Sequence, residues 1–192
     1  MSKVGIKCLT YAKFTGGGDG SAVTYSGGKM LRDYLARAEL TETRNTQKEY
    51  ADDHQIDGEN CLSAVALALE LVNNNADIKK DILGHVADTD DMIVTGDDAP
   101  FVGIGYIMKN RFKGVVTYET YWVYKIQFAT NGVAADTKKE QTAFGHETIN
   151  GDGMGVILTD GGKVYFYAHN DTHATEAAAI SWLKGKAGIT GA

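Results

Sequence analysis

Large apolar residues alternate with small or polar residues along much of the chain, and this period of two is typical of β-strands with one buried face. The strongest case is the run LSAVALALELV, in which the large residues at every second position are Val65, Leu67, Leu69 and Leu71. The positions between them hold Ala64, Ala66, Ala68 and Glu70. The run predicts a strand whose second face is thin enough for another element or another subunit to pack against it, and an ordinary internal strand explains it equally well.

The segment Val116–Phe128 is the clearest amphipathic strand. Its aromatic and aliphatic residues of one parity are Tyr118, Trp122, Tyr124, Ile126 and Phe128, and the polar residues between them include Glu119, Lys125 and Gln127. Further strands are expected at residues 3–14, 22–25, 36–44 and 101–108. An Asp-Gly pair inside residues 155–169 indicates a hairpin.

Two helices are predicted between or after these strands. Asn73–Asn75 offers N-caps for a short helix that ends at Gly84. The apolar stripe of this helix is Ile78, Ile82 and Leu83. A second amphipathic helix is expected over residues 174–184, with its end at Gly185.

Two polar segments, residues 44–60 and 129–148, are predicted to be long loops, and loops of that length in a compact domain usually contact a partner or carry a function. The expected fold is therefore mainly β: an antiparallel β-sandwich or barrel with a flanking internal helix and a C-terminal helix. The 192 residues suffice for one domain with a proper core, so a single domain over residues 1–192 is predicted.

Composition narrows the class of protein. The net charge is −6 and no block of lysine and arginine occurs, which argues against tight binding to nucleic acid. No apolar run approaches the ~20 residues of a membrane span, and the N-terminus lacks the apolar stretch of a signal peptide. Cys8 and Cys61 each lie in an apolar run and are interpreted as buried thiols.

The acidic stretch YADDHQIDGEN, residues 50–60, invites comparison with a calcium-binding EF-hand loop. When Asp53 is taken as position 1, Asp57 and Gly58 fit positions 5 and 6. Position 12, which needs a bidentate glutamate, is Ala64. The stretch therefore reads as a solvated acidic segment rather than an EF-hand.

Catalytic motifs are incomplete. The glycine-rich segment TGGGDGS follows a predicted strand but opens no helix, and no standard P-loop occurs. His146 and Glu147 begin like a zinc-protease motif, but Asn150 stands where the second histidine belongs. His169 and His173 have a spacing that suits one helical turn, which alone is a weak metal signal. We expect no enzyme, no bound metal and no cofactor.

Several segments follow one another in a distinctive order between Gln47 and Phe128. They are QKE followed by YADD, the apolar alternating strand, ADIKKDILGH, an acidic linker, DDAPFVGIGYIMK and YETYWVYKIQF. In this order and spacing the chain resembles the major tail proteins of long-tailed phages of Gram-positive bacteria. The resemblance covers roughly Lys3 to Tyr167.

The resemblance implies a structural protein of the virion tail that is made and assembled in the host cytoplasm. Members of this family fold as a β-sandwich with a flanking helix, and the fold is similar to that of the tube protein of type VI secretion. They form hexameric rings that stack into a tail tube around a tape measure protein and meet tail terminator and distal tail proteins. DNA passes through the tube without specific binding, and neither a membrane nor a catalytic residue is implied.

Two surfaces follow as hypotheses. Asp52, Asp53, Asp57 and Glu59 are assigned to a ring-stacking or lumen surface, since a tube that conducts DNA must not bind phosphate. The alanine face of Ala64, Ala66 and Ala68 is assigned to an inter-subunit contact. The alternative function is a β-sandwich ligand-binding or adhesion module, with calcium held by the acidic loop.

Overall fold

The computed structural model describes residues 2–51, 54–72, 76–88, 91–93, 98–130, 146–160 and 162–189, with the backbone alone for 49–51, 54–59, 87–88, 91–92 and 130. Its elements are antiparallel strands and two helices, which confirms the predicted fold class. In chain order they are β1 (Ser2–Gly16), β2 (Thr24–Leu31), β3 (Leu35–Ala51), β4 (His54–Leu71), α1 (Ala76–Asp81), β5 (Val86–Asp88), β6 (Asp91–Ile93), β7 (Val102–Phe112), β8 (Val115–Thr130), β9 (Glu147–Gly153), β10 (Val156–Ile157), β11 (Val164–Tyr165), β12 (Tyr167–His173) and α2 (Glu176–Ala187).

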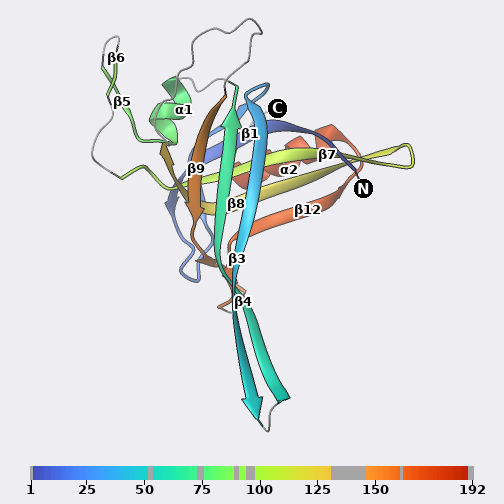
Figure 1. Cartoon of the computed structure of the whole chain (residues 1–192). Coiled ribbons are helices and arrows are strands. Elements are labelled where there is room, and N and C mark those ends of the chain that lie inside the picture. The colour runs from blue at the N-terminus through green and yellow to red at the C-terminus, as the bar shows by residue number, and fades with distance from the viewer. Residues whose placement is uncertain are drawn as a thin grey trace, which may run out of the picture.

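One eight-stranded sheet contains most of the strands, in the order β2-β1-β7-β8-β9-β4-β3, with β12 also paired to β8 (Figure 1). β8 pairs along one edge with β7. Its other edge is shared, because residues 118–123 pair with β12 and residues 126–130 pair with β9. The sheet therefore divides at β8: one branch ends at β12, and the other continues through β9 to β4 and β3.

Both parts of the sheet line one apolar core. Leu9 and Tyr11 of β1 are fully buried there with residues of β7 and β8, and they share the core with Leu67, Leu69 and Leu71 of β4. The β9-β4-β3 part thus packs over the β1-β7-β8 part in the manner of a sandwich. The alternation in Leu62–Val72 correctly predicted which β4 residues are buried.

α1 closes one end of this core, and the predicted stripe is buried: Ile78 lies in the helix, and Ile82 and Leu83 directly follow its end at Asp81. Asp81 fastens it to the sheet, since its carboxylate oxygens lie 2.8 Å from Lys13 Nζ and 2.8 Å from Lys29 Nζ. Burial opposes ionisation of Asp81, but the bonds to both lysines outweigh it and hold the pKa of this carboxyl below its ordinary value. α1 is therefore held by both apolar contacts and ion pairs.

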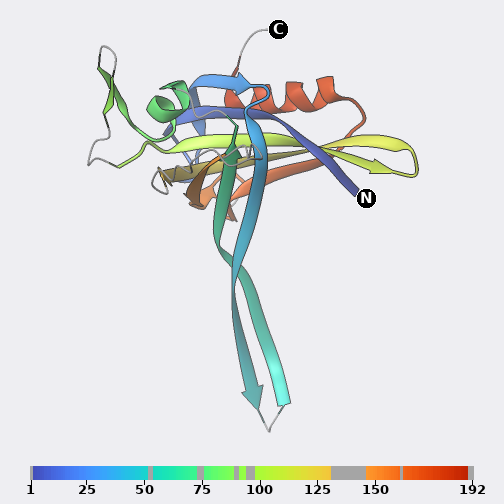
Figure 2. The same ribbon diagram turned by 45° about the horizontal axis from the view of Figure 1, so that its top comes forward.

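α2 covers the opposite face of the β1-β7-β8 part (Figure 2). The buried residues of this second cluster are Cys8, Ala12, Ile107, Trp122, Ala179, Leu183 and Ala187. Gly105 permits the close approach, because a Cβ there would lie 2.4 Å from the Tyr121 carbonyl oxygen and 2.8 Å from Leu183 Cδ2. The molecule therefore has α2, the β1-β7-β8 part and the β9-β4-β3 part in successive layers.

The end of α2 differs from the prediction. The helix continues through Gly185 to Ala187, and Gly188 is the C-cap, with a left-handed φ of 66°. The reason is packing: Ala187 is buried against the sheet, so the last turn gains apolar contact that stopping at Gly185 would forfeit. A glycine signals a helix end only where its backbone is left-handed.

The prediction that the large apolar residues of one parity in Val116–Phe128 share one face is wrong in one respect. Trp122 and Tyr124 contact the α2 cluster, whereas Ile126 and Phe128, of the same parity, lie in the core between the two sheet parts. The cause is a register shift against β7, where Val102 pairs with Ile126 but Ile104 pairs with Val123. The extra residue in β8 forms a bulge that moves the following side chains to the other face.

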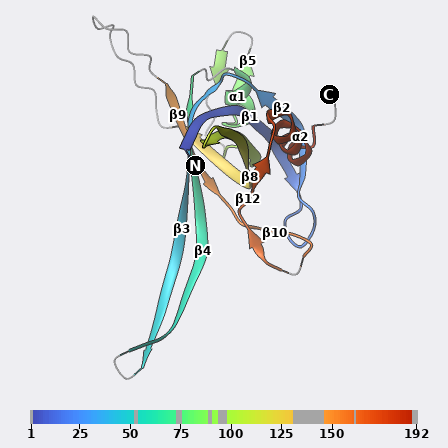
Figure 3. The ribbon, with the colours of Figure 1, turned by 90° about the vertical axis from the view of Figure 1, so that its right-hand side faces the viewer.

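The predicted loop at residues 44–60 is also wrong. β3 and β4 continue as a two-stranded ribbon, here residues 44–63, with backbone pairs from Arg44↔Leu62 to Ala51↔His54. β9 accompanies β4 only as far as Val65↔Gly153, so the ribbon leaves the sheet without a third strand. Figure 3 shows it extending away from the body. Long polar strands with few apolar residues resemble loops in sequence, because their pairing is with each other rather than with a core.

The second predicted loop, residues 129–148, is shorter than expected at both ends, since Thr130 belongs to β8 and Glu147 begins β9. Residues 131–145 lie outside the described ranges. Cys8 is buried as predicted, but Cys61 is exposed because it lies on the ribbon. Neither helix of the described chain is long and apolar enough to cross a bilayer.

Two glycine substitutions test this packing. Gly105→Ala should lower the free energy of unfolding by about 1–3 kcal/mol, because the added methyl group meets backbone and the buried face of α2. Gly185→Ala should raise it by about 0.5–1 kcal/mol, because the position is helical and open. Urea unfolding monitored by circular dichroism measures both. A Gly105→Ala protein with the same free energy of unfolding as wild type would contradict the close packing of α2 on β7.

Candidate functional site

The acidic residues selected from the sequence lie on the ribbon or next to it in the chain. Asp52 and Asp53 lie outside the described residues. Asp57 and Glu59 belong to β4, where their backbones pair with Glu49 and Gln47. The pairing places Asp57 opposite another acid in the sequence, and the role of these carboxylates stays a prediction.

The alanine face is found where the alternation placed it, opposite the buried leucines of β4. Ala64 and Ala66 are exposed, and Ala68 is half-buried. Ala66 and Ala68 pair on both sides, with β3 and with β9, so this part of β4 is internal to the sheet. An exposed face on an internal strand suits a contact with another subunit, which stays a prediction.

The histidines are separated by the fold. His146 Nδ1 lies 3.0 Å from Glu70 Oε1. His169 and His173 are on strand β12 rather than on a helix, and they contact Glu119 and Thr120 respectively. Where side chains are described, no three histidine, cysteine or acidic residues come together in a way that could hold a metal ion.

A tyrosine-lined groove is the feature that the sequence did not reveal. β1, β3, β7, β8 and β12 border an open cavity of about 310 Å³ lined by Lys3, Ala38, Glu39, Leu40, Glu42, Tyr106, Met108, Tyr121 and Tyr167. The rings of Tyr106 and Tyr121 stack with centroids 5.3 Å apart, and Tyr121 stacks on His169 at 4.6 Å. We call this cavity the tyrosine groove.

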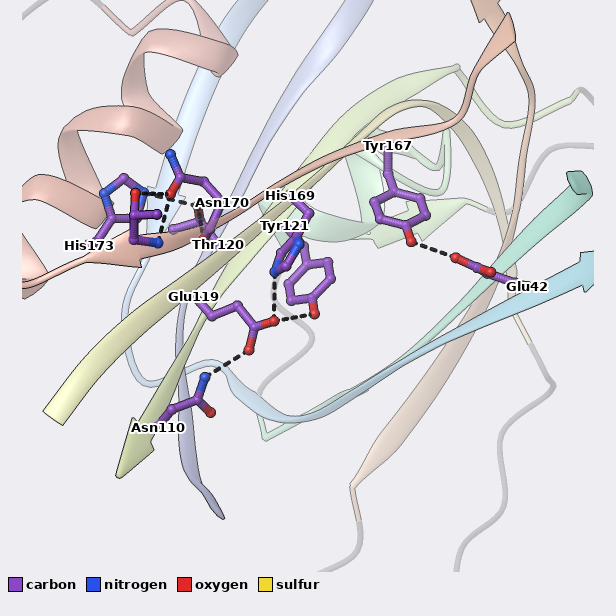
Figure 4. A network of polar contacts seen from close by, with 10 residues as sticks. Glu42, Asn110, Glu119, Thr120, Tyr121, Tyr167, His169, Asn170 and His173 are labelled. Carbon is purple, nitrogen blue, oxygen red and sulfur yellow. Dashed lines mark hydrogen bonds and ion pairs between the residues drawn. The ribbon is translucent and has the colours of Figure 1, made fainter. Parts of the chain in front are cut away.

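Glu119 is the polar centre beside the tyrosine groove (Figure 4). Its Oε1 accepts a hydrogen bond from the Tyr121 hydroxyl at 2.7 Å and lies 2.6 Å from His169 Nε2, while Oε2 accepts from Asn110 Nδ2 at 2.8 Å. Burial opposes the charge of Glu119, but these hydrogen bonds outweigh it and lower the pKa. The carboxylate is therefore ionised at neutral pH and orients the rings around it.

A second polar contact, between Tyr167 and Glu42, joins the base of the ribbon to β12. The Tyr167 hydroxyl donates a hydrogen bond to Glu42 Oε1, and Arg44 Nη2 lies 2.9 Å from Glu42 Oε2. The hydrogen bond from Tyr167, followed by that from Arg44, lowers the pKa of Glu42. The same bond, with burial, raises the pKa of Tyr167 to about 12. Both groups keep their ordinary charge at neutral pH.

The tyrosine groove combines neutral phenols with ionised carboxylates. Burial raises the pKa values of Tyr106 and Tyr121, so their phenols stay neutral, and the neighbouring carboxylates stay ionised. Such groups are not poised for proton transfer near neutral pH. Neutral aromatic rings beside fixed carboxylates suit a cationic or aromatic group from a partner.

A second cavity of about 340 Å³ lies beside the bulge of β1, where Lys7, Cys8, Arg32 and Glu176 contribute to its lining. Lys7 Nζ is 2.8 Å from Glu176 Oε2 and ties β1 to the start of α2. Burial raises the pKa of the Cys8 thiol, which keeps it protonated and unreactive. This cavity therefore has no activated nucleophile in Cys8.

Little in the sequence marks the tyrosine groove. Tyr106, Tyr121 and Tyr167 are spread over three strands whose pairing alone brings them together. The one local signal is Glu119, an acid among aromatic residues in a strand that is otherwise largely apolar.

Comparison with models of protein families and with curated proteins finds no match for this chain.

Glu119→Gln tests the ionised state of the network. The free energy of unfolding at pH 7 should fall by about 1–2 kcal/mol, because charge-assisted hydrogen bonds become neutral ones. Since the folded pKa of Glu119 is lowered, its contribution is present above the unfolded pKa and is lost as pH falls through the folded pKa. The difference in free energy of unfolding between wild type and Glu119→Gln should therefore shrink as the pH is lowered from 7 to 3.5, as measured by urea unfolding.

Asp171→Asn, at an exposed carboxylate on β12, is the control and should change stability by less than about 0.5 kcal/mol. A difference between wild type and Glu119→Gln that stays constant over this pH range would contradict an ionised Glu119 with a lowered pKa.

Proposed function

We propose that this protein is the subunit of a phage tail tube. It forms hexameric rings that stack around a tape measure protein, and the finished tube conducts DNA into the host cell. It acts as a structural protein of the virion tail, assembles in the host cytoplasm, and meets tail terminator and distal tail proteins. The single observation that carries the proposal is the unsupported ribbon, in combination with the resemblance.

The ribbon gains little stability from contacts within a single subunit. Its eight residues per strand from Arg44 to Ala51 span roughly 25 Å at about 3.3 Å per residue. Over this length the described backbone pairs only within the ribbon. An isolated two-stranded hairpin is marginally stable in water, because it buries too little apolar surface. A partner that packs against the ribbon would supply this surface, and a neighbouring ring is that partner in a stacked tube.

The edges of the sheet suit ring formation. Among the strands that the structure describes, β2 pairs only with β1, and β3 pairs only with β4. Each therefore presents unpaired backbone groups on its outer side, which can pair with another chain. A contact between unlike edges repeats from subunit to subunit and closes a ring when the rotation permits.

The charge also agrees with a conduit for DNA. With a net charge of −6, the protein repels a phosphate backbone rather than binding it. The acids of the segment from Asp52 to Glu59 belong to the part of the chain that we assign to stacking or to the lumen. Their negative charge would keep DNA from adhering as it passes.

Shortening the ribbon tests the proposal. Residues 47–59 are replaced by Asn-Gly, so that Thr46↔Asn60 becomes the last pair before a two-residue turn. Rings should no longer stack into tubes, whereas the melting temperature should stay close to that of wild type because the removed backbone pairs only with itself. Negative-stain microscopy and sedimentation velocity at high concentration, with and without the tape measure protein, measure assembly.

A full-length variant with Asp52, Asp53 and Asp57 changed to lysine separates charge from length, and we expect it to fold normally but to assemble or pass DNA poorly. Lys163→Ala, at an exposed position near β11, is the control that should assemble like wild type. Tubes from the shortened protein would contradict the role of the ribbon. A wild-type protein that forms neither rings nor tubes under any condition would overturn the proposed function.

Calcium separates the tube subunit from the alternative adhesion module. A tube subunit without a calcium site should keep the same melting temperature in 1 mM calcium and in chelator. A site in the segment from Asp52 to Glu59 would instead raise the melting temperature with calcium, because a ligand that binds only the folded state stabilises it. Differential scanning calorimetry distinguishes the two functions.

A further inference from the structure

The β7–β8 hairpin ends in an exposed apolar tip, defined as Phe112–Val115. Phe112 is 52% exposed and Val115 is 63% exposed. β1 accompanies β7 only as far as Ser2↔Arg111, so the tip extends past the neighbouring strand, as Figure 2 also shows. Two adjoining large apolar residues at the end of a hairpin thus leave more than half of their surface exposed within their own subunit.

The hairpin tip is also basic and strained. Residues 108–117 contain Lys109, Arg111 and Lys113 and no acid, although the whole chain carries a net charge of −6. The two turn residues have left-handed φ angles, 47° for Lys113 and 87° for Gly114. Such turns favour asparagine or glycine at the first of these positions, so Lys113 is unfavourable for local stability. Its ammonium lies 5.5 Å from the centroid of the Phe112 ring, so a cation and an aromatic ring are displayed together.

The tyrosine groove has the complementary chemistry. Two carboxylates, Glu39 and Glu42, and one ammonium, Lys3, contribute to its lining. Glu39 pairs with Arg37 and Glu42 with Arg44, each through one oxygen, and Glu119 lies behind Tyr121. Its aromatic faces can contact an apolar ring or a cation. Its volume of about 310 Å³ is at the lower end for binding sites, which suits one or two side chains rather than a whole loop.

The Tyr106 hydroxyl in the tyrosine groove is available to bind a partner. Tyr106 is 3% exposed and lines the cavity. Throughout the described part of the chain, no group donates to its hydroxyl or accepts from it. Among the described residues Asn110 Oδ1 is the one fully buried polar side-chain atom without a partner, so the Tyr106 hydroxyl is open to the tyrosine groove and can pair with an incoming group. The tip of a hairpin offers backbone carbonyl and N–H groups that could pair with it.

We infer that the tyrosine groove of one copy receives the β7–β8 hairpin tip of a second copy. Phe112 stacks against the tyrosine rings, and Lys113 faces Glu39 and Glu42. The contact joins two different surfaces, so each subunit can repeat it with the next one, as rings and stacks require. The inference rests on the proposed function and deepens it, because it names the residues through which tube subunits meet.

Three variants test the contact through the concentration needed for assembly, measured by sedimentation velocity. Phe112→Ser should raise this concentration about tenfold or more, since it removes the buried anchor. Tyr106→Phe should raise it about three- to tenfold by removing one hydrogen bond across the interface, while leaving the monomer about as stable as wild type. Lys113→Asn keeps the turn and removes only the charge, so its effect should be smaller than that of Phe112→Ser.

A cross-link tests the contact without relying on assembly or on the folding of these variants. In a Cys61→Ser background, Val115→Cys protein is mixed with Glu39→Cys protein under mild oxidation, and Cys8 is buried and does not interfere. A disulfide-linked mixed dimer should form far faster than in a control mixture of Lys163→Cys with Glu39→Cys. Non-reducing gels measure the yield.

The outcomes separate the contact from the proposed function. If wild type assembles but the variants assemble equally well and no mixed dimer exceeds the control, the contact is overturned and the tube function stands. If the mixed dimer forms while wild type makes neither rings nor tubes, the contact stands and the tube function falls. Failure of both measurements overturns both, including the case in which the tyrosine groove binds a small cation or an unrelated protein instead.

Discussion

The backbone pairing of β8 is the constraint on which the rest of the body depends. β7, β9 and β12 pair with it directly, and the remaining strands of the large sheet are connected to it through one or two intervening strands. One strand edge cannot serve both β9 and β12 in the same register and direction of curvature, and the bulge between Val123 and Ile126 lies where the partner changes. Because β12 stays with one half of β8 while β9, β4 and β3 turn away, a space opens between β3 and β12, which becomes the tyrosine groove.

The sequence predicted the elements in which a single pattern decides the structure. The leucines of β4 alternate without interruption, and α1 has a compact apolar stripe, so both were correctly assigned to the core. Local patterns were insufficient where long-range pairing decides. The bulge in β8 is a register difference with β7, and the continuation of α2 past Gly185 depends on a buried contact of Ala187.

The ribbon and the tyrosine groove were missed for related physical reasons. A strand is recognised by its hydrophobic face, and residues 44–60 have almost none, since they leave the core of their own subunit. The tyrosine groove is assembled from residues that lie far apart in the sequence, up to the 125 positions between Glu42 and Tyr167. Surfaces that contact another chain thus lack the hydrophobic periodicity by which core residues are recognised in a sequence.

The bond between Tyr167 and Glu42 connects these two surfaces mechanically. Glu42 lies at the root of the ribbon and also lines the tyrosine groove, so it marks the fulcrum of an arm that is long compared with the groove itself. A sideways displacement at the far end of such an arm becomes a much smaller rotation at its root, where it changes the separation of β3 and β12. The direction of the ribbon and the separation of β3 and β12 therefore share one anchor at Glu42, so an occupant that fixes the groove would also fix the direction in which the ribbon leaves the sheet.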